Sequence, residues 1–221
     1  MATENLTLAQ FFGTQRNPFN YAKVEQINRD IQTSWLTLED ITQQINNWDD
    51  ESQDTYLTSL ELAVRMAIED YLGLSIFPVQ YRVYYPNYGA LQSAVFLDLP
   101  EVATGYQGAN AVTIDSVKYY GNNAGPAPTA IDPTTYFYDP TGNRIVLTSI
   151  PTELSQTIAN PIVATYTLNA SFAAQYPVIK QAALLLFTHL YNNRSNTTEG
   201  VLHEIPFGIA QLLRPYKPLV M

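Results

Sequence analysis

The sequence predicts an α+β protein, in which a mostly antiparallel β region is inserted into a small helical bundle. Apolar residues recur at three- and four-residue steps in residues 37–73 and 176–214, as on one face of an α-helix. Between them, residues 75–170 hold short β-branched and aromatic runs bounded by Gly, Pro and Asn. Strands and helices do not alternate, which argues against a doubly wound nucleotide-binding fold.

The first 36 residues are predicted to form an arm. They are polar and are interrupted by Gly13 and Pro18, and Val24–Ile31 has the spacing of a short helix. Two interpretations stay open for this segment, a partly disordered tail and a segment that orders only against a neighbouring chain. Its aromatic side chains are dense for a purely solvated tail: Phe11, Phe12, Phe19 and Tyr21.

Two helices are predicted next. Thr37 is a good N-cap, and Asp40 stands where its side chain can reach back to the cap, so the first helix runs from there to about Trp48. An acidic turn over residues 49–54 favours the start of the second helix, from about Thr55 to Leu72. Gly73 is placed to end it.

The second helix has two predicted faces. One is a buried apolar stripe, and the other is a solvated face of ion pairs at four-residue spacing, Glu61, Arg65 and Glu69. The stripe consists of Leu57, Leu60, Val64, Ala67, Ile68 and Tyr71.

The β region is predicted to contain six strands, with a hairpin over Tyr136–Leu147 whose turn is Asp139–Asn143. Gly121–Pro128 is a predicted loop. The predicted strands are Gln80–Tyr85, Ala94–Leu99, Ala111–Tyr120, Thr135–Tyr138, Arg144–Thr148 and Ile162–Leu168.

A third long helix is predicted from Pro177 to about Asn193, and a short one over Phe207–Leu213. The run 182–187 is apolar all round, so this helix is expected to be covered on most sides. Burial of the three leucines and the phenylalanine in that run supplies roughly 6–12 kcal/mol before entropy is subtracted.

Composition narrows the functional classes. The chain has 221 residues, no cysteine, 16 tyrosines, 9 phenylalanines and a formal net charge of -9. No disulfide or thiolate metal site is available, and we read no secretion signal or membrane span in the sequence. Scattered basic residues on an acidic chain do not suit a protein that grips DNA, although DNA can pass nearby without sticking.

No catalytic pattern is present, and we expect neither an enzyme nor a cofactor or metal. His189 lies on the apolar third helix, as a core or interface histidine does, and His203-Glu204 lacks the second histidine of a zinc-protease helix. Four carboxylates stand at strand ends or turns, where Asp is common for local reasons. A glycosidase-like pair among them stays open. They are Asp98, Asp115, Asp132 and Asp139.

The order of elements and several sequence blocks resemble the head–tail connector (adaptor) proteins of tailed bacteriophages. The resemblance runs from about Leu38 to Lys217 and includes Ile68-Glu-Asp-Tyr-Leu-Gly73 and Phe96-Leu-Asp-Leu-Pro100. Its most specific block is Pro206-Phe-Gly208, which opens a short helix ending in Leu212-Leu-Arg-Pro-Tyr-Lys217. The family's usual Thr-Gly-Arg after the second helix reads Leu72-Gly-Leu74 here, and residues 1–36 have no counterpart.

The resemblance implies a structural virion protein in the neck, made in the host cytoplasm. It implies a homo-oligomeric ring of about twelve copies beneath the portal protein, in contact with tail or neck proteins, with DNA passing through. The domains would be an arm (1–36), a connector domain (37–217) and a C-terminal tail (218–221). The predicted oligomer or portal contacts are Phe11, Phe12, Phe19, Tyr21, Pro206, Phe207, Gly208, Leu212, Leu213, Pro215, Tyr216 and Lys217.

Three other hypotheses stay open at this point. One is a neck stopper or tail-completion protein elsewhere in the virion. Another is a β-rich carbohydrate-binding or hydrolytic module, suggested by the tyrosines and the turn carboxylates. The last is a small DNA-binding factor, which the net charge does not favour.

Overall fold

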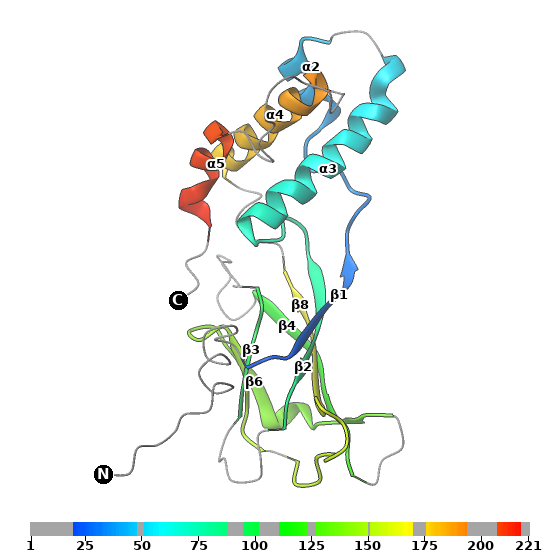
Figure 1. The fold of residues 1–221 in the computed structure, drawn as a ribbon, viewed down its shortest axis with the longest axis vertical. Coiled ribbons are helices and arrows are strands. Elements are labelled where there is room, and N and C mark those ends of the chain that lie inside the picture. Colours follow the sequence, from blue (N-terminus) through cyan, green and yellow to red (C-terminus); the bar gives the residue numbers. More distant parts are fainter. Residues whose placement is uncertain are drawn as a thin grey trace, which may run out of the picture. The chain divides into compact units, whose positions relative to one another are not determined.

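A computed structural model describes residues 20–47, 51–87, 95–101, 111–122, 127–149, 151–169, 176–193 and 207–217. Helices and antiparallel strands together confirm the predicted α+β class (Figure 1). The chain divides into two compact units. The β unit comprises Met1–Ile27, Gln80–Pro100 and Val112–Thr167, and the helical unit comprises Asn28–Val79, Glu101–Ala111 and Leu168–Met221.

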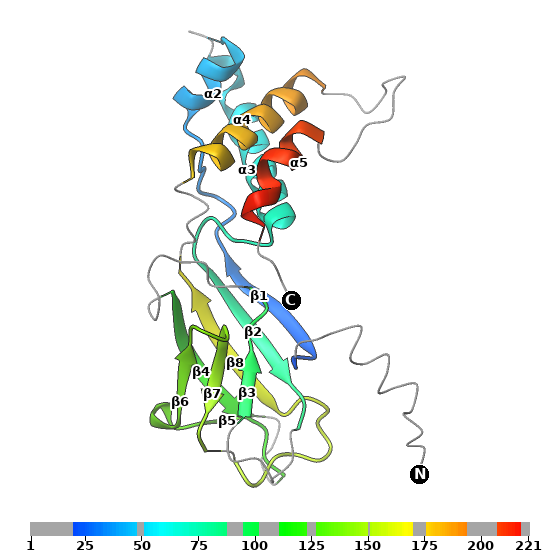
Figure 2. The ribbon, with the colours of Figure 1, turned by 90° about the vertical axis from the view of Figure 1, so that its left-hand side faces the viewer.

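The β unit is built from two sheets that face each other as layers (Figures 1 and 2). The five-stranded sheet has the order β1 (Lys23–Arg29), β2 (Val79–Tyr85), β8 (Ile162–Leu168), β4 (Val112–Tyr119) and β5 (Thr129–Ala130). The three-stranded sheet has the order β3 (Val95–Asp98), β7 (Arg144–Leu147) and β6 (Tyr136–Asp139), and both of its strand pairs are antiparallel.

Alternation of side chains creates the core between these sheets. In β2, every second residue from Val79 to Tyr85 is buried, as the period of two in a strand requires. In the three-stranded sheet, Leu97 and Ile145 are fully buried opposite each other. The predicted hairpin is confirmed: β6 and β7 pair across residues 140–143, where the Asp139 carboxylate accepts the Thr141 N–H (3.0 Å).

One segment of the predicted arm was assigned the wrong structure. Residues 23–29 form strand β1 beside β2, not a short helix. The helical spacing of the apolar residues did not determine the secondary structure of this segment. Pairing with a neighbouring strand overrides such a weak local pattern. Residues 1–19 and 218–221 lie outside the described residues, so the division into arm, connector domain and tail stays a prediction.

The helical unit contains α2 (Leu38–Ile45), α3 (Asp54–Leu72), α4 (Pro177–Asn192) and α5 (Phe207–Leu213). Short 3-10 turns precede α3 (Glu51–Gln53) and follow α5 (Arg214–Tyr216). The predicted capping box is present, since the Thr37 hydroxyl accepts the Asp40 N–H (3.1 Å) and Asp40 accepts the Thr37 N–H (3.1 Å). Gly73 ends α3 in the left-handed region at φ 67°.

The apolar core of this unit lies among α2, α3, α4 and α5. The predicted stripe of α3 faces it: Leu57, Val64 and Ile68 are fully buried, and the rest of the stripe is half-buried against them. In α4, Leu186 and Phe187 are buried, while Leu185 is 39% exposed. The expectation that α4 is covered on most sides is therefore confirmed except on the face of Leu185.

The second face of α3 is not solvated, contrary to the prediction. Glu61 and Arg65 are fully buried, and Glu69 is 5% exposed. None of the three pairs with the next one along the helix. Each instead binds backbone or charge from another segment, since a buried charge must be hydrogen-bonded to be tolerated.

These three side chains hold the connection from β1 to α2 against α3. A carboxylate oxygen of Glu61 accepts the N–H groups of Trp35 (2.9 Å) and Leu36 (3.0 Å). Arg65 donates to the carbonyl oxygens of Thr33 (2.7 Å) and Asp30. We call Glu61, Arg65 and Glu69 the polar ladder of α3.

Glu69, the last residue of the polar ladder, binds two segments of the chain. Glu69 accepts from the Arg29 guanidinium (Nε–Oε2 3.1 Å) and from the N–H of Ile76 (2.8 Å). The ladder thereby satisfies backbone groups of irregular segments that have no secondary-structure partner. Its residues position the chain.

Candidate interaction surfaces

The C-terminal block 206–217, which carries the most specific part of the resemblance, divides between core and surface. Ile209 and Leu213 of α5 are buried against the other helices, at 4% and 0% exposure. Leu212 is 37% exposed, and Gly208 and Pro215 are also exposed. Because adjacent helical residues point about 100° apart, α5 presents one face inward and another outward.

Aromatic and cationic contacts fasten this block. The Tyr71 hydroxyl donates to the Ala210 carbonyl oxygen (3.2 Å), and the Lys217 Nζ lies 5.1 Å from the centre of the Tyr71 ring. The half-buried Tyr216 ring meets that of Tyr176 edge to face, with centroids 5.0 Å apart. The end of the chain as far as Lys217 is thus held on the helical unit.

Only part of the predicted contact set can be placed. Phe11, Phe12, Phe19 and Pro206 lie outside the described residues, as does the side chain of Phe207. Tyr21 is half-buried in the β unit, where burial and then the charge of Asp98 raise the pKa of its phenol. The structure does not bring Tyr21 together with the C-terminal residues into one described site.

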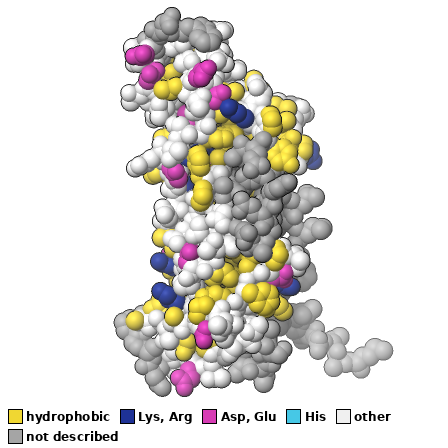
Figure 3. Space-filling model, turned by 180° about the vertical axis from the view of Figure 1, so that it is seen from behind, with side chains coloured by type: hydrophobic (Ala, Val, Ile, Leu, Met, Phe, Trp, Pro, Cys, Tyr) yellow, Lys and Arg dark blue, Asp and Glu magenta, His cyan; other side chains and the backbone are white. Residues whose placement is uncertain are grey.

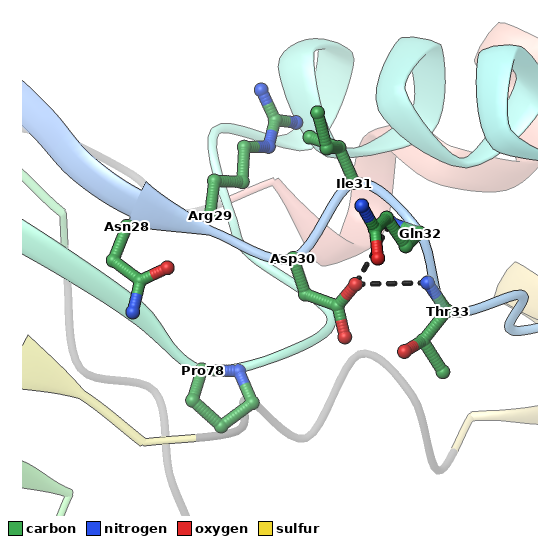
Figure 4. Close-up of a pocket in the computed structure, with 7 residues that line it drawn as sticks. All are labelled: Asn28, Arg29, Asp30, Ile31, Gln32, Thr33 and Pro78. Atoms are coloured by element: carbon green, nitrogen blue, oxygen red, sulfur yellow. Dashed lines mark hydrogen bonds between the residues drawn. The ribbon is translucent and has the colours of Figure 1, made fainter.

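An open depression of about 590 Å³ lies at the end of β1 and along the residues that follow it (Figure 4). The Asp30 carboxylate accepts the N–H groups of Gln32 (2.9 Å) and Thr33 (2.8 Å). Hydrogen bonds from Thr33 and then Gln32 lower the pKa of Asp30 to about 2. This carboxylate is engaged in closing a turn. It is lined by Asn28, Arg29, Asp30, Ile31, Gln32, Thr33 and Pro78.

The predicted turn carboxylates have local partners. Asp132 accepts the Thr134 N–H (2.9 Å), and Asp139 accepts the Arg144 guanidinium (3.0 Å). Asp115 accepts from Gln80 (2.8 Å) and Thr167 (2.9 Å). Within the described ranges, no group of three or more His, Asp or Glu side chains is arranged to hold a metal, and no helix is long and apolar enough to cross a membrane.

Charge is scattered over the surface. The face drawn in Figure 3 shows hydrophobic side chains in several groups, with acidic and basic side chains interspersed among them. The basic residues on this face do not gather into a broad patch of the kind that neutralises phosphates. His189 is half-buried on α4, where Asn193 lies against its ring, and His203-Glu204 is outside the described residues.

The sequence did not reveal one exposed aromatic pair. Phe96 in β3 and Phe137 in β6 are 43% and 53% exposed. Phe96 lies between the buried Val95 and Leu97, and Phe137 lies between two half-buried tyrosines. The alternation along these short strands was therefore the available clue to an outward-facing aromatic residue.

Solved structures share this fold over nearly the whole chain. One is from the neck of an empty gene transfer agent (GTA) particle computed with C6 symmetry, at 17% identity and TM-score 0.60. Others are from the virion of a native GTA particle (15%, 0.57) and from the neck of a native GTA particle computed with C12 symmetry (16%, 0.53). Each match covers 90% of this chain and 97% of the other. Neither a protein-family model nor a curated protein matches the sequence.

Proposed function

We propose that this chain is a structural subunit of the neck of a tailed phage or phage-like particle, and specifically a head–tail connector. In this role several copies form a ring beneath the portal, join head to tail and let DNA pass. The observation that carries the proposal is the fold match, over 90% of this chain, to neck and virion chains of GTA particles, two of them computed with C6 or C12 symmetry. The resemblance of the C-terminal block 206–217 to connector proteins supports it independently.

A ring of identical copies requires two contact faces on each copy, and the exposed apolar side chains of this chain can supply them. Each copy must offer two different faces, because one face of a subunit meets another face of the next. Exposed apolar side chains occur in both units, among them Leu185 and Leu212 on helices and Phe96 and Phe137 on strands. Such side chains favour association when they gather into patches.

The predicted contact residues stand as part of the proposal. The aromatic side chains of residues 1–21 would contact a neighbouring subunit or the portal. In the C-terminal block, Leu212, Pro215 and Lys217 are exposed for such a contact, whereas Leu213 supports the helix from inside.

The net charge of the chain suits a protein that lets DNA pass better than one that binds DNA tightly. A net charge of -9 disfavours lasting contact with phosphates, so DNA slides past without being held. We expect no retardation of duplex DNA in a gel-shift assay at low salt. A tight, salt-sensitive complex there would instead support the DNA-binding alternative.

Electron microscopy of particles carrying gold-labelled antibody against this chain tests the proposal. We expect label at the neck, next to the portal. Label displaced from the portal toward the tail would support the neck-stopper or tail-completion alternative. Absence of the chain from purified particles would overturn both.

A further inference from the structure

The outer face of the three-stranded sheet carries an aromatic row. The register pairs Val146 of β7 with Phe96 of β3 on one side and with Phe137 of β6 on the other. Residues directly opposite each other in a sheet point to the same face. The three side chains therefore form one row across all three strands, which we call the outer row. A phenylalanine is exposed at each end, and Val146 between them is buried, at 8% exposure.

A second row on the same face is charged. Two residues along each strand, Asp98 pairs with Arg144, and Arg144 pairs with Asp139. Arg144 is bonded to Asp139 (3.0 Å), and its guanidinium carbon lies 4.3 Å from the centre of the Phe96 ring. The guanidinium thus fixes the Phe96 ring beside the polar row. A fixed aromatic patch with a polar border has the composition of a protein-binding surface.

The chain leading to the N-terminal arm begins at the edge of this sheet. The Asn20 side chain accepts the Asp98 N–H (3.0 Å) and donates to the Phe96 carbonyl oxygen, and its own N–H donates to the Asp98 carboxylate (3.2 Å). One amide side chain thereby occupies outward-facing backbone groups of edge strand β3, as a neighbouring strand would. Asn20, the first described residue of the chain, is thus fixed at the edge of this sheet.

We infer that the outer row is the docking surface for residues 1–19 of a neighbouring copy. Three phenylalanines in that segment, Phe11, Phe12 and Phe19, match the aromatic row in chemistry. Asn20 is the eighth residue after Phe12, so an extended chain lets the two lie up to about 27 Å apart. The arm is therefore long enough to cross a three-stranded sheet, whose outer strands are about 10 Å apart.

The proposed ring favours a neighbouring copy over the same copy as the source of this segment. A ring needs one donor surface and one acceptor surface on each copy, and residues 1–19 together with the outer row supply both. The acceptor row ends in Phe96 and Phe137, which are 43% and 53% exposed. The inference rests on the proposed ring. It assigns residues 1–19 and the outer row as the two surfaces through which neighbouring copies make contact.

Because the chain lacks cysteine, disulfide trapping gives a clean test. Particles are prepared with the double variant Phe12→Cys/Phe137→Cys, oxidised, and separated on a denaturing gel without reductant. Docking in a neighbour links each copy to the next and gives a ladder of covalent multimers. A band at monomer size with an internal link, or no link at all, would overturn the inference. The matched control, Phe12→Cys with Ser59→Cys on α3, should give no ladder.

A second variant covers the case in which the cysteine pair fails to assemble. Phe137→Ser should fold as the wild type does but lower incorporation into particles about tenfold, as loss of an aromatic interface contact does. Phe137→Tyr should restore incorporation. Normal incorporation of Phe137→Ser would contradict the inference while leaving a neck role intact, whereas loss of the neck label from wild-type particles would reject the proposed function itself.

Discussion

The polar ladder of α3 and the outer face of the three-stranded sheet place charged and aromatic side chains in opposite ways. In the helical unit, the polar ladder of α3 is buried, and the aromatic Phe187 is fully covered. In the β unit, the charged residues Asp98, Arg144 and Asp139 share the outer face of a sheet with two exposed phenylalanines. Burying a charge costs free energy unless the charge is hydrogen-bonded or paired. An exposed aromatic ring loses the favourable free energy that its burial would supply. The buried charges of α3 and the exposed phenylalanines of the sheet therefore each indicate a role beyond packing of the core.

For the helical unit, that role is to hold irregular backbone in place. The ladder binds backbone groups between residues 30 and 36 and the N–H of Ile76, all of which lie outside helices and strands. For the β unit, we propose that the role is binding. The comparison predicts that removing a ladder residue unfolds the protein, whereas removing an outer-row residue spares the fold and weakens assembly.

The largest effect is expected at the ladder. Glu69→Ala leaves the Arg29 guanidinium and the Ile76 N–H without this acceptor, and loss of one partner of a buried pair costs about 3–5 kcal/mol of unfolding free energy. Asp70→Ala is the matched control, since the Asp70 side chain is 72% exposed and should cost less than about 0.5 kcal/mol. Urea denaturation of both variants measures the difference. Equal stabilities would show that the ladder does not position the chain.

Variants of the two adjacent leucines of α5 distinguish an effect on folding from an effect on assembly. Leu213→Ala truncates a fully buried side chain and should cost about 2–5 kcal/mol in thermal or urea unfolding. Leu212→Ala, at a position 37% exposed, should change stability by less than about 0.5 kcal/mol but lower incorporation into particles. If Leu212→Ala proves as unstable as Leu213→Ala, the C-terminal block is core alone and its proposed contact role is wrong.

A smaller stability effect is expected on the outer row. Phe96→Leu removes the ring over which the Arg144 guanidinium lies, an interaction of about 0.5–1 kcal/mol at an exposed site. Urea unfolding should therefore show a loss within that range. A loss of several kcal/mol would mean that the row belongs to the fold.

The smallest effect concerns pH. Because hydrogen bonds from Thr33 and Gln32 hold the folded-state pKa of Asp30 at about 2, below its ordinary 3.8, the carboxylate stabilises the fold above about pH 4. That contribution is lost as the pH falls toward 2. Asp30→Asn should therefore flatten the acid limb of stability between pH 4 and 2 in thermal melts. An unchanged slope would show that this turn is not coupled to folding.

Long periodic segments were predictable from the sequence because their local preferences agree with their packing. The capping box at Thr37, the end of α3 at Gly73 and the hairpin over Tyr136–Leu147 all follow from local chemistry. Strand β1 was not predictable, since its partner β2 lies some 50 residues away and its own pattern is ambiguous.

The polar ladder escaped the sequence analysis for a related reason. Glu and Arg four residues apart are typical of a solvated helix face, and only the path of residues 30–36 over α3 makes that face an interior. The C-terminal block was found through resemblance rather than derivation. The outer row required the register of β3, β7 and β6, which no local pattern supplies.

Quantitative mass spectrometry of purified particles, with the major capsid protein as internal standard, tests the central claim most directly. A connector ring predicts a fixed small number of copies per particle, about twelve if the ring has the C12 symmetry applied to the native GTA neck. A count that varies between preparations, or fewer than about one copy per particle, would contradict a neck ring.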